Sequence, residues 1–201
     1  MNNSRYSREK WDQRWQKKSA LSAGQADDWL LRIMPHLPDE GMALDLACGM
    51  GRNALAVARV GYQVTAVDFS QVALDELSTA AAQEDLPVAA VCADLEAGDY
   101  RVAPGSFDLG LQFYYLYRPL LPLLQDAVRP GGYIVIRTFS QAGVERFGPV
   151  NREISFVPGE LLRLFFGWEI MLYEEGLEPS RKGGSLVGLF ARKKKCEVLH
   201  T

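Results

Sequence analysis

One stretch near residue 45 constrains the fold more than any other part of the chain. The run Ala43–Ala54 has the pattern of a short apolar strand that ends in a Gly-x-Gly turn, formed by Gly49 and Gly51, and then starts a helix. A glycine-rich turn between a strand and a helix lets the backbone approach a nucleotide closely and points helix N–H groups at it. The pattern therefore predicts a nucleotide-like ligand at this turn.

The same pattern continues as an alternation of strands and helices. Short apolar strands are expected near residues 42–47, 63–67, 88–92, 107–113 and 132–138, followed by a helix near 159–166 and strands near 168–175 and 185–192. The first four strands each lead into a helix-like or turn segment. This order favours a doubly wound, Rossmann-like α/β fold, a mostly parallel sheet with helices on both faces. Ligands of such sheets bind beyond the carboxyl ends of the strands.

Two further segments are expected near that edge. Residues 1–40 are predicted to form a helical cap, in which Ser7 caps a helix that carries Trp11 and Trp15 on one face. The irregular segment 141–158 is a candidate lid. Residues 41–201 are predicted to form the ligand-binding domain, and the chain is expected to be a single domain overall.

The composition indicates a small-molecule partner. The balance of 22 Lys+Arg against 25 Asp+Glu gives a net charge of −3, which offers no general field for nucleic acid or an anionic membrane. No apolar run approaches the roughly 20 residues of a membrane span, and the chain starts without the apolar core of a signal peptide. A cytoplasmic protein is therefore expected. The three cysteines show no Cys-x-x-Cys pairing, so free thiols and no metal site are expected.

Polar residues follow the predicted strands at the points where ligands bind. Asp45 lies inside the first strand, Asp68 follows the second, Asp94 follows the third and Gln112 ends the fourth. Asp68 comes near the spacing at which an acid accepts hydrogen bonds from ribose hydroxyls. Asp94 is placed to recognise an adenine amino group, with the base resting against Leu95 or Phe69.

The negative charge of Asp45 distinguishes between two candidate nucleotide cofactors. The spacing of Gly49, Gly51 and Ala54 also fits the dinucleotide fingerprint, which makes an NAD(P)-dependent oxidoreductase one alternative. A dinucleotide would bring its pyrophosphate to this turn, where the carboxylate of Asp45 would repel it. S-adenosylmethionine carries an ammonium group that Asp45 attracts. A non-catalytic nucleotide-binding module is the second alternative, because binding residues alone do not require turnover.

At this point the chain resembles the class I S-adenosylmethionine-dependent methyltransferases. The resemblance is carried by Leu-Asp-Leu-Ala-Cys-Gly-Met-Gly at 44–51, Val-Asp-Phe-Ser at 67–70, Ala-Asp-Leu at 93–95, Phe-Asp-Leu at 107–109 and Arg-Pro-Gly-Gly-Tyr at 129–133. Gly-Arg-Asn at 51–53, Pro-Gly-Glu-Leu at 158–161 and Tyr-Glu-Glu at 173–175 are similar to the tellurite-resistance, TehB-like branch. Members of that branch commonly have a His before the Arg that matches Arg181, and this chain has Ser180 instead.

The resemblance implies a seven-stranded sheet with an antiparallel last strand. It also implies that the N-terminal segment around Trp11 and Trp15 closes over the cofactor. Together with the strand-end residues, this gives the expected cofactor-binding set: Trp11, Trp15, Asp45, Ala47, Gly49, Gly51, Arg52, Asn53, Asp68, Phe69, Asp94, Leu95 and Gln112. For Arg52 and Asn53, contact with the cofactor and completion of the turn are equally good interpretations.

The residues after the fourth strand bear on the methyl acceptor. The stretch 112–119 supplies aromatic rings and a cation but neither a His nor a carboxylate that would serve as general base. Tyr117, Arg118 and Arg181 are the candidate catalytic residues. Arginines at the mouth of the site favour an acceptor that is already nucleophilic: an oxyanion such as tellurite or selenite, a thiolate, or a small carboxylate. The alternative is that these arginines form ordinary surface ion pairs.

Overall fold

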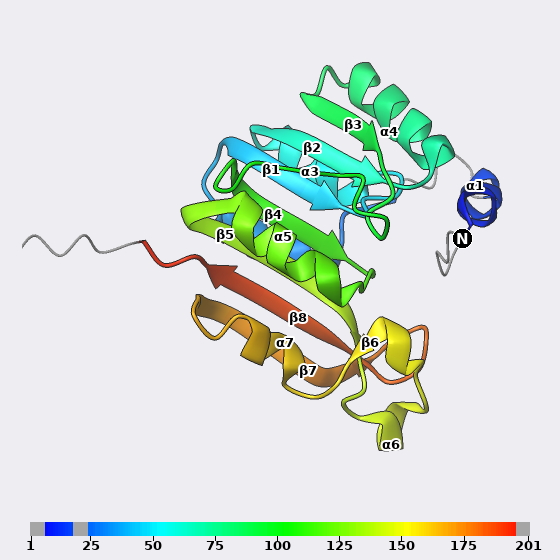
Figure 1. The fold of residues 1–201 in the computed structure, drawn as a ribbon, viewed down its shortest axis with the longest axis vertical. Coiled ribbons are helices and arrows are strands. Elements are labelled where there is room, and N and C mark those ends of the chain that lie inside the picture. The colour runs from blue at the N-terminus through cyan, green and yellow to red at the C-terminus, as the bar shows by residue number, and fades with distance from the viewer. Residues whose placement is uncertain (1–6, 18–23, 196–201) are drawn as a thin grey trace, which may run out of the picture. The chain divides into compact units, whose positions relative to one another are not determined.

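The structure is a computed structural model that describes residues 7–17 and 24–195 (Figure 1). Contacts between Cα atoms divide the chain into two compact units, residues 1–102 and residues 103–201. The predicted division at residue 40 and the prediction of a single domain are not tested by this partition and stay predictions.

The first unit is built on three parallel strands in the order β3-β2-β1. The strands are β1 (Gly41–Leu46), β2 (Tyr62–Asp68) and β3 (Val88–Cys92), joined by helices α3 (Arg52–Arg59) and α4 (Gln71–Gln83). The register pairs Asp45 with Ala66 and Asp68 with Cys92, so the carboxyl ends of all three strands meet at one edge. This is the edge where the sequence places its acids.

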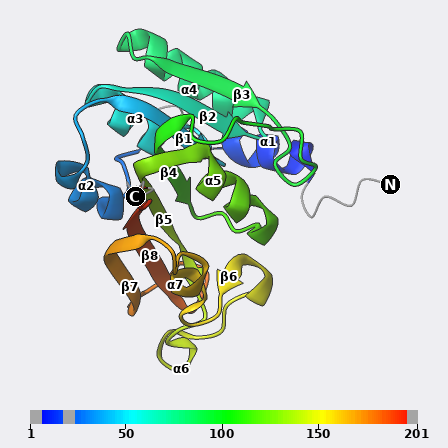
Figure 2. The ribbon, with the colours of Figure 1, turned by 60° about the vertical axis from the view of Figure 1, so that its left-hand side comes forward.

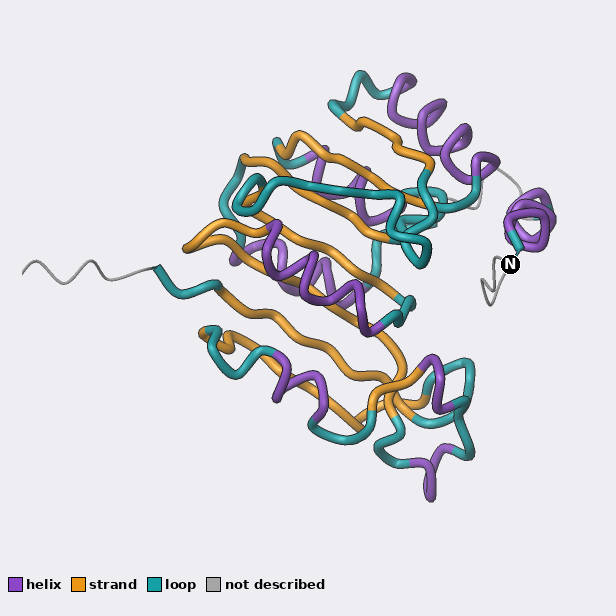
Figure 3. The backbone as a smooth tube through the Cα atoms, in the orientation of Figure 1, coloured by secondary structure: helices purple, strands orange, loops and turns teal. Residues whose placement is uncertain are grey.

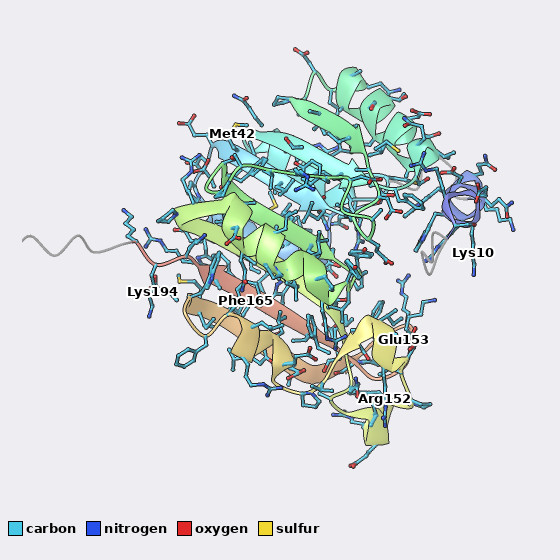
Figure 4. All side chains as sticks on the ribbon, viewed as in Figure 1. Lys10, Met42, Arg152, Glu153, Phe165 and Lys194 are labelled. Atoms are coloured by element: carbon cyan, nitrogen blue, oxygen red, sulfur yellow. The ribbon has the colours of Figure 1, made fainter. Side chains whose placement is uncertain are left out.

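Two N-terminal helices precede these strands. Helix α1 (Arg8–Gln16) is capped by Ser7, as predicted, and helix α2 (Asp28–Ile33) leads into a 3-10 turn, η2 (Met34–His36). Figures 1 and 2 both show α1 beyond the arrowheads of the three strands, next to α4. In Figure 4, Lys10 marks α1 and Met42 marks the opposite, amino end of β1.

The second unit holds four long strands in the order β4-β5-β8-β7. They are β4 (Phe107–Phe113), β5 (Val128–Ser140), β7 (Glu169–Pro179) and β8 (Ser185–Arg192). Strands β4 and β5 are parallel, and β8 runs antiparallel to both β5 and β7. The antiparallel last strand that the sequence predicts is therefore confirmed. A two-residue strand, β6 (Ser155–Phe156), also pairs with β5, so the described residues hold one short strand more than the seven predicted.

Short helices connect these strands. The turn η3 (Arg118–Leu120) and helix α5 (Leu121–Ala127) lie between β4 and β5, and α7 (Glu160–Leu164) precedes β7. The segment 141–158, predicted to be irregular, contains α6 (Val144–Phe147) and η4 (Arg152–Ile154), which appear in Figure 3 as short helices within loop. Figure 4 labels Arg152 and Glu153 in this segment.

Candidate functional site

The turn after β1 has a backbone that requires glycine. Ala47, Gly49 and Gly51 have φ angles of 57°, 57° and 73°, in the left-handed region that L side chains rarely adopt. A Cβ on Gly51 would lie 2.2 Å from Cδ1 of Leu77 in α4. Ala47 adopts the same region despite its side chain, and such strained positions cluster at binding sites. The local geometry is therefore that of the strand-turn-helix nucleotide motif.

Asp45 is the most unusual charged group of the first unit. Its side chain is 2% exposed, and its Oδ2 has no hydrogen-bond partner among the described residues. Burial raises the pKa of Asp45 to about 8, and the nearby charge of Asp68 acts in the same direction. A hydrogen bond from the backbone of Ala54 and the charge of Arg52 oppose this shift. A buried carboxyl with an open oxygen is suited to accept a cation.

Asp68 ties the glycine turn to the end of β2. Its Oδ2 accepts a hydrogen bond of 2.7 Å from the backbone N–H of Gly49, and its Oδ1 accepts one of 2.9 Å from the N–H of Ser70. Burial raises the pKa of Asp68, and these backbone hydrogen bonds act against the increase. Each carboxylate oxygen has a second lone pair, so Asp68 can hold the turn and still accept from a hydroxyl group.

Asp94 forms a turn after β3. Its Oδ1 accepts hydrogen bonds from the N–H groups of Glu96 and Ala97, at 2.9 and 3.1 Å. Its neighbour Leu95 is 8% exposed. The turn fixes the carboxylate at the strand end, and Oδ2 makes no hydrogen bond with the described residues. The predicted adenine role of Asp94 remains a prediction.

Arg52 and Asn53 both contact the segment before α2. A nitrogen of Arg52 lies 3.0 Å from the carboxylate of Asp27, and Oδ1 of Asn53 accepts a hydrogen bond of 2.9 Å from the N–H of Asp27. Asp27 in turn caps α2. These contacts join the start of α3 to the start of α2, and both interpretations of Arg52 and Asn53, completion of the turn and contact with the cofactor, stay predictions.

Helix α1 presents one face to the predicted cofactor residues. The guanidinium of Arg8 lies 4.8 Å from the ring centroid of Phe69, and Asp12 accepts a hydrogen bond from the hydroxyl of Ser70. The indole of Trp15 reaches within 2.8 Å of the point where a Cβ on Gly49 would lie. Residues 8, 12 and 15 share a helix face by their spacing. Sequence analysis identified Trp15 but missed Arg8 and Asp12, although their spacing from Trp15 carried the signal.

Trp11 lies on the same helix and contacts Trp15. The two indoles are stacked with their centroids 6.4 Å apart, and the guanidinium of Arg14 lies 4.8 Å from the Trp11 ring. None of the residues of α1 is fully buried. Both indoles are half-buried, and the covering role predicted for Trp11 and Trp15 stays a prediction.

Gln112 is the predicted cofactor residue of the second unit. It is 1% exposed at the end of β4, and its Nε2 donates a hydrogen bond of 2.9 Å to the carbonyl of Tyr115. Its Oε1 is buried with no hydrogen-bond partner among the described residues. An unsatisfied buried amide oxygen costs free energy until a donor reaches it.

The candidate catalytic residues have separate local roles. Arg118 pairs with Glu160 and donates a hydrogen bond of 3.0 Å to the carbonyl of Ser155, which ties η3 to β6 and α7. Tyr117 caps η3, and Arg181 is exposed in the turn between β7 and β8. Arg118 thus forms the ion pair that the sequence analysis kept as an alternative.

Arg137 is a charged residue that sequence analysis missed. It is 8% exposed within the strand β5. The signal was available, because a cation directly after the apolar run 133–136 and within a strand is unusual, as is Asp45 inside β1.

Comparison with known proteins finds similarity to methyltransferases over part of the chain. Residues 43–132 match the methyltransferase domain family. The chain is 32% identical over 139 residues to hemagglutinin 1 of Eikenella corrodens, covering 67% of this chain and 46% of that protein. It is 27% identical over 144 residues to a Haemophilus influenzae TehB protein named as a probable S-adenosyl-L-methionine-dependent methyltransferase, covering 69% of this chain and 50% of that one. The chain spans about half the length of these curated relatives.

A solved structure has the same fold. The crystal structure of TehB from Haemophilus influenzae superposes with a TM-score of 0.68 at 23% identity, covering 92% of this chain and 68% of that one. The Rossmann-like fold class predicted from the sequence is thereby confirmed. The matched domain, together with the similarity to TehB in sequence and in fold, supports a class I S-adenosylmethionine-dependent methyltransferase of the TehB-like kind, as the motifs predict. The same matches support S-adenosyl-L-methionine as the cofactor.

No described helix has the length and apolar character that crossing a bilayer requires. Within residues 7–17 and 24–195, no three His, Cys, Asp or Glu side chains gather in a way that would hold a metal ion. Cys48 and Cys92 are free thiols, and burial raises the pKa of Cys48, while Cys196 lies outside the described residues. A cytoplasmic location and the absence of a nucleic-acid partner stay predictions.

Proposed function

We propose that this protein transfers a methyl group from S-adenosyl-L-methionine to a small-molecule acceptor that is an anion or a soft nucleophile. The observation that carries the proposal is the open, buried oxygen of Asp45 beside the Gly49–Gly51 turn. The ammonium of the methionine portion supplies the cation that this oxygen lacks. A neighbouring pyrophosphate would place negative charge beside two carboxyl groups, Asp45 and Asp68, whose pKa values are already raised.

The contacts around the turn support a role for each predicted residue. Asp68 keeps an acceptor site for the ribose hydroxyls, and Asp94 stands at the next strand end for the adenine amino group. Phe69 and Leu95 offer apolar surface to the base. Gln112 has an open amide oxygen that can accept from the methionine portion.

Helix α1 is proposed to cover the cofactor. Its contacts reach Phe69, which is proposed to face the adenine, Gly49 of the glycine turn, and Ser70, whose N–H donates to the proposed ribose ligand Asp68. An adenine on Phe69 would compete with the guanidinium of Arg8, which requires α1 to shift when the cofactor enters. Closure of such a segment excludes water from the reacting groups.

Methyl transfer depends more on the relative position of the two reactants than on a strong base. A lone pair of the acceptor attacks the methyl carbon in line, the new bond forms as the bond between that carbon and the sulfonium sulfur breaks, and S-adenosylhomocysteine leaves. Holding both reactants in this geometry accounts for about 7–11 kcal/mol of a barrier. A thiol acceptor loses its proton to solvent before the attack. Tyr117, Arg118 and Arg181 remain the candidates for handling the acceptor.

The test compares cofactor binding by isothermal titration calorimetry. We expect S-adenosylhomocysteine to bind the full chain and NADH not to bind. Asp45→Asn should weaken that binding at least about tenfold, because a charge-assisted hydrogen bond is lost. Asp75→Asn, on the exposed face of α4, is the control and should leave affinity unchanged. Preferential binding of NADH would favour the oxidoreductase alternative. Tight S-adenosylhomocysteine binding without methylation of any acceptor in a broad panel would favour a non-catalytic module.

A further inference from the structure

Ser70 binds two carboxylates at the carboxyl end of β2. Its backbone N–H donates a hydrogen bond of 2.9 Å to Oδ1 of Asp68, and its hydroxyl donates one to Oδ1 of Asp12 in α1. The same hydroxyl oxygen accepts from the N–H of Ala73, which makes Ser70 the N-cap of α4. Asp68 also lies near Asp45, whose buried Oδ2 has no partner among the described residues. Two acids from distant segments thus meet beside the proposed cofactor site.

Asp68 has little remaining capacity to accept hydrogen bonds. A carboxylate offers about four lone-pair positions. The N–H of Gly49 occupies a position on Oδ2, and the N–H of Ser70 occupies one on Oδ1. The backbone N–H of Phe69 is a further donor to the same carboxylate. These donors leave about one position free, whereas a ribose brings two neighbouring hydroxyl donors.

Asp12 offers the acceptor that Asp68 lacks. Its Oδ1 binds the Ser70 hydroxyl, and its Oδ2 makes no hydrogen bond with the described residues. The side chain is half-buried, so a ligand at the strand end can reach it. Burial raises the pKa of Asp68, and the charge of Asp12 adds to this rise because the two carboxylates lie close together. Negative charge at this place favours a ligand that donates hydrogen bonds.

A cation on the same helix face reduces the repulsion between the two acids. Arg8 and Asp12 stand at positions i and i+4 of α1 and therefore share a face. The guanidinium of Arg8 lies 4.8 Å from the ring centroid of Phe69, the residue directly after Asp68. The second carboxylate is thus tolerated before a ligand binds, and hydroxyl donors from a ligand would stabilise it further.

We propose that Asp12 is a ribose-binding residue: Asp68 accepts from one ribose hydroxyl group of S-adenosylmethionine, and Asp12 accepts from the other. This inference rests on the proposed methyltransferase function and concerns the first unit of the chain. It gives α1 a part in recognising the cofactor as well as in covering it. A cofactor analogue that lacks one hydroxyl group leaves one carboxylate without its donor, so the site rejects it.

A docking contact is the alternative role of Asp12. In that case its carboxylate only fixes α1 beside the start of α4 through Ser70. Loss of a docking contact weakens the binding of every cofactor analogue by the same factor. Loss of a ribose acceptor changes the ratio between the affinities for the ribose form and a deoxyribose form. This ratio therefore separates the two roles.

The test measures this ratio by isothermal titration calorimetry with the full chain. The ligands are S-adenosylhomocysteine and its 2′-deoxy and 3′-deoxy forms. The variants are Asp12→Ala, Asp12→Asn and Glu9→Ala. Glu9 is the matched control, because it is an exposed acid of the same helix.

We expect wild type and Glu9→Ala to bind each deoxy form at least about tenfold more weakly than S-adenosylhomocysteine. Asp12→Ala should lose the discrimination against one deoxy form and keep it against the other, which reports on Asp68. Asp12→Asn keeps a neutral acceptor oxygen, so it should retain part of the discrimination that Asp12→Ala loses.

Three results would overturn the inference. They are wild type that binds either deoxy form as tightly as the ribose form, discrimination against both forms that persists in Asp12→Ala, and discrimination that is lost for both forms in that variant. If Asp12→Ala does not fold or does not bind, Asp12→Asn decides, and discrimination equal to that of wild type rejects the proposal. Failure of wild type to bind S-adenosylhomocysteine would instead refute the methyltransferase proposal itself.

Discussion

The carboxylate of Asp68 accepts a 2.7 Å hydrogen bond from the backbone N–H of Gly49, which joins the end of β2 to the glycine turn after β1. The other oxygen of the same carboxylate accepts a hydrogen bond from the N–H of Ser70, the N-cap residue of α4. One side chain thus fixes two turns that border the proposed cofactor site, and it stays available to a ribose hydroxyl.

Replacement of Asp68 should therefore affect stability as well as binding. Asp68→Ala leaves two buried N–H groups without their acceptor, and each such group costs about 1–3 kcal/mol. We expect a lower free energy of unfolding in urea and a weaker affinity for S-adenosylhomocysteine. Asp75→Ala on the exposed face of α4 serves as the control. Equal stability of Asp68→Ala and wild type would contradict the assigned role of Asp68.

Asp45 should make stability and cofactor binding depend on pH in opposite directions. Its folded-state pKa of about 8 lies above the ordinary value of 3.8, so the folded protein binds more protons than the unfolded chain between these values. The contribution of Asp45 to stability is therefore full below pH 4 and is lost as the pH rises through 8. Denaturant titrations at several pH values should show a steeper slope in wild type than in Asp45→Asn, which keeps the contribution of Asp68, whose pKa is also raised.

Binding of the cationic cofactor should instead favour ionised Asp45. We expect affinity for S-adenosylmethionine to rise between pH 6 and about 8, with release of a proton from Asp45 on binding. Calorimetry in two buffers of different ionisation enthalpy measures the released proton. A proton count equal in wild type and Asp45→Asn would show that another group is responsible.

Gly49 and Trp15 should behave as a coupled pair. Gly49→Ala places a Cβ 2.8 Å from the indole and forces a left-handed φ of 57° on an alanine. The backbone strain alone costs about 1–2 kcal/mol. Trp15→Ala in the same chain should recover the part of the loss that comes from the clash, while the strain remains. A double-mutant cycle measures this coupling, and strictly additive effects would place Trp15 away from Gly49 in solution.

Helix α1 should become more protected when the cofactor binds. We expect amide hydrogen exchange in residues 8–16 to slow at saturating S-adenosylhomocysteine, and to slow less in Asp12→Ala, which removes the hydrogen bond to Ser70. Asp28→Ala, in the first turn of α2, is a control acid outside α1. Exchange in α1 that is faster with ligand bound would show that the helix opens instead of closing.

Much of the architecture follows from local sequence. The predicted strands at 63–67, 88–92 and 107–113 match β2, β3 and β4 closely, because each is a short, mostly apolar run that is contiguous in sequence. The strand at 132–138 was predicted too short, since β5 begins at Val128 and includes the Pro-Gly-Gly sequence at 130–132. A β-bulge near Leu109 accommodates that sequence within the sheet.

The residues of the candidate site also differ in how far the sequence predicts them. Asp45, Asp68 and the glycine turn could be predicted from the sequence, because an acid in an apolar strand and a left-handed backbone are features of the immediate neighbourhood. The contacts of Asp12 with Ser70, 58 positions away, and of Arg137 with Glu178 arise from the packing of distant segments. The first contact depends on how helix α1 packs beside the ends of the strands. The second involves Glu178, which lies in the irregular part of β7 between Glu175 and Pro179. No periodicity of the chain encodes either arrangement, because each arises from packing between segments that are distant in sequence.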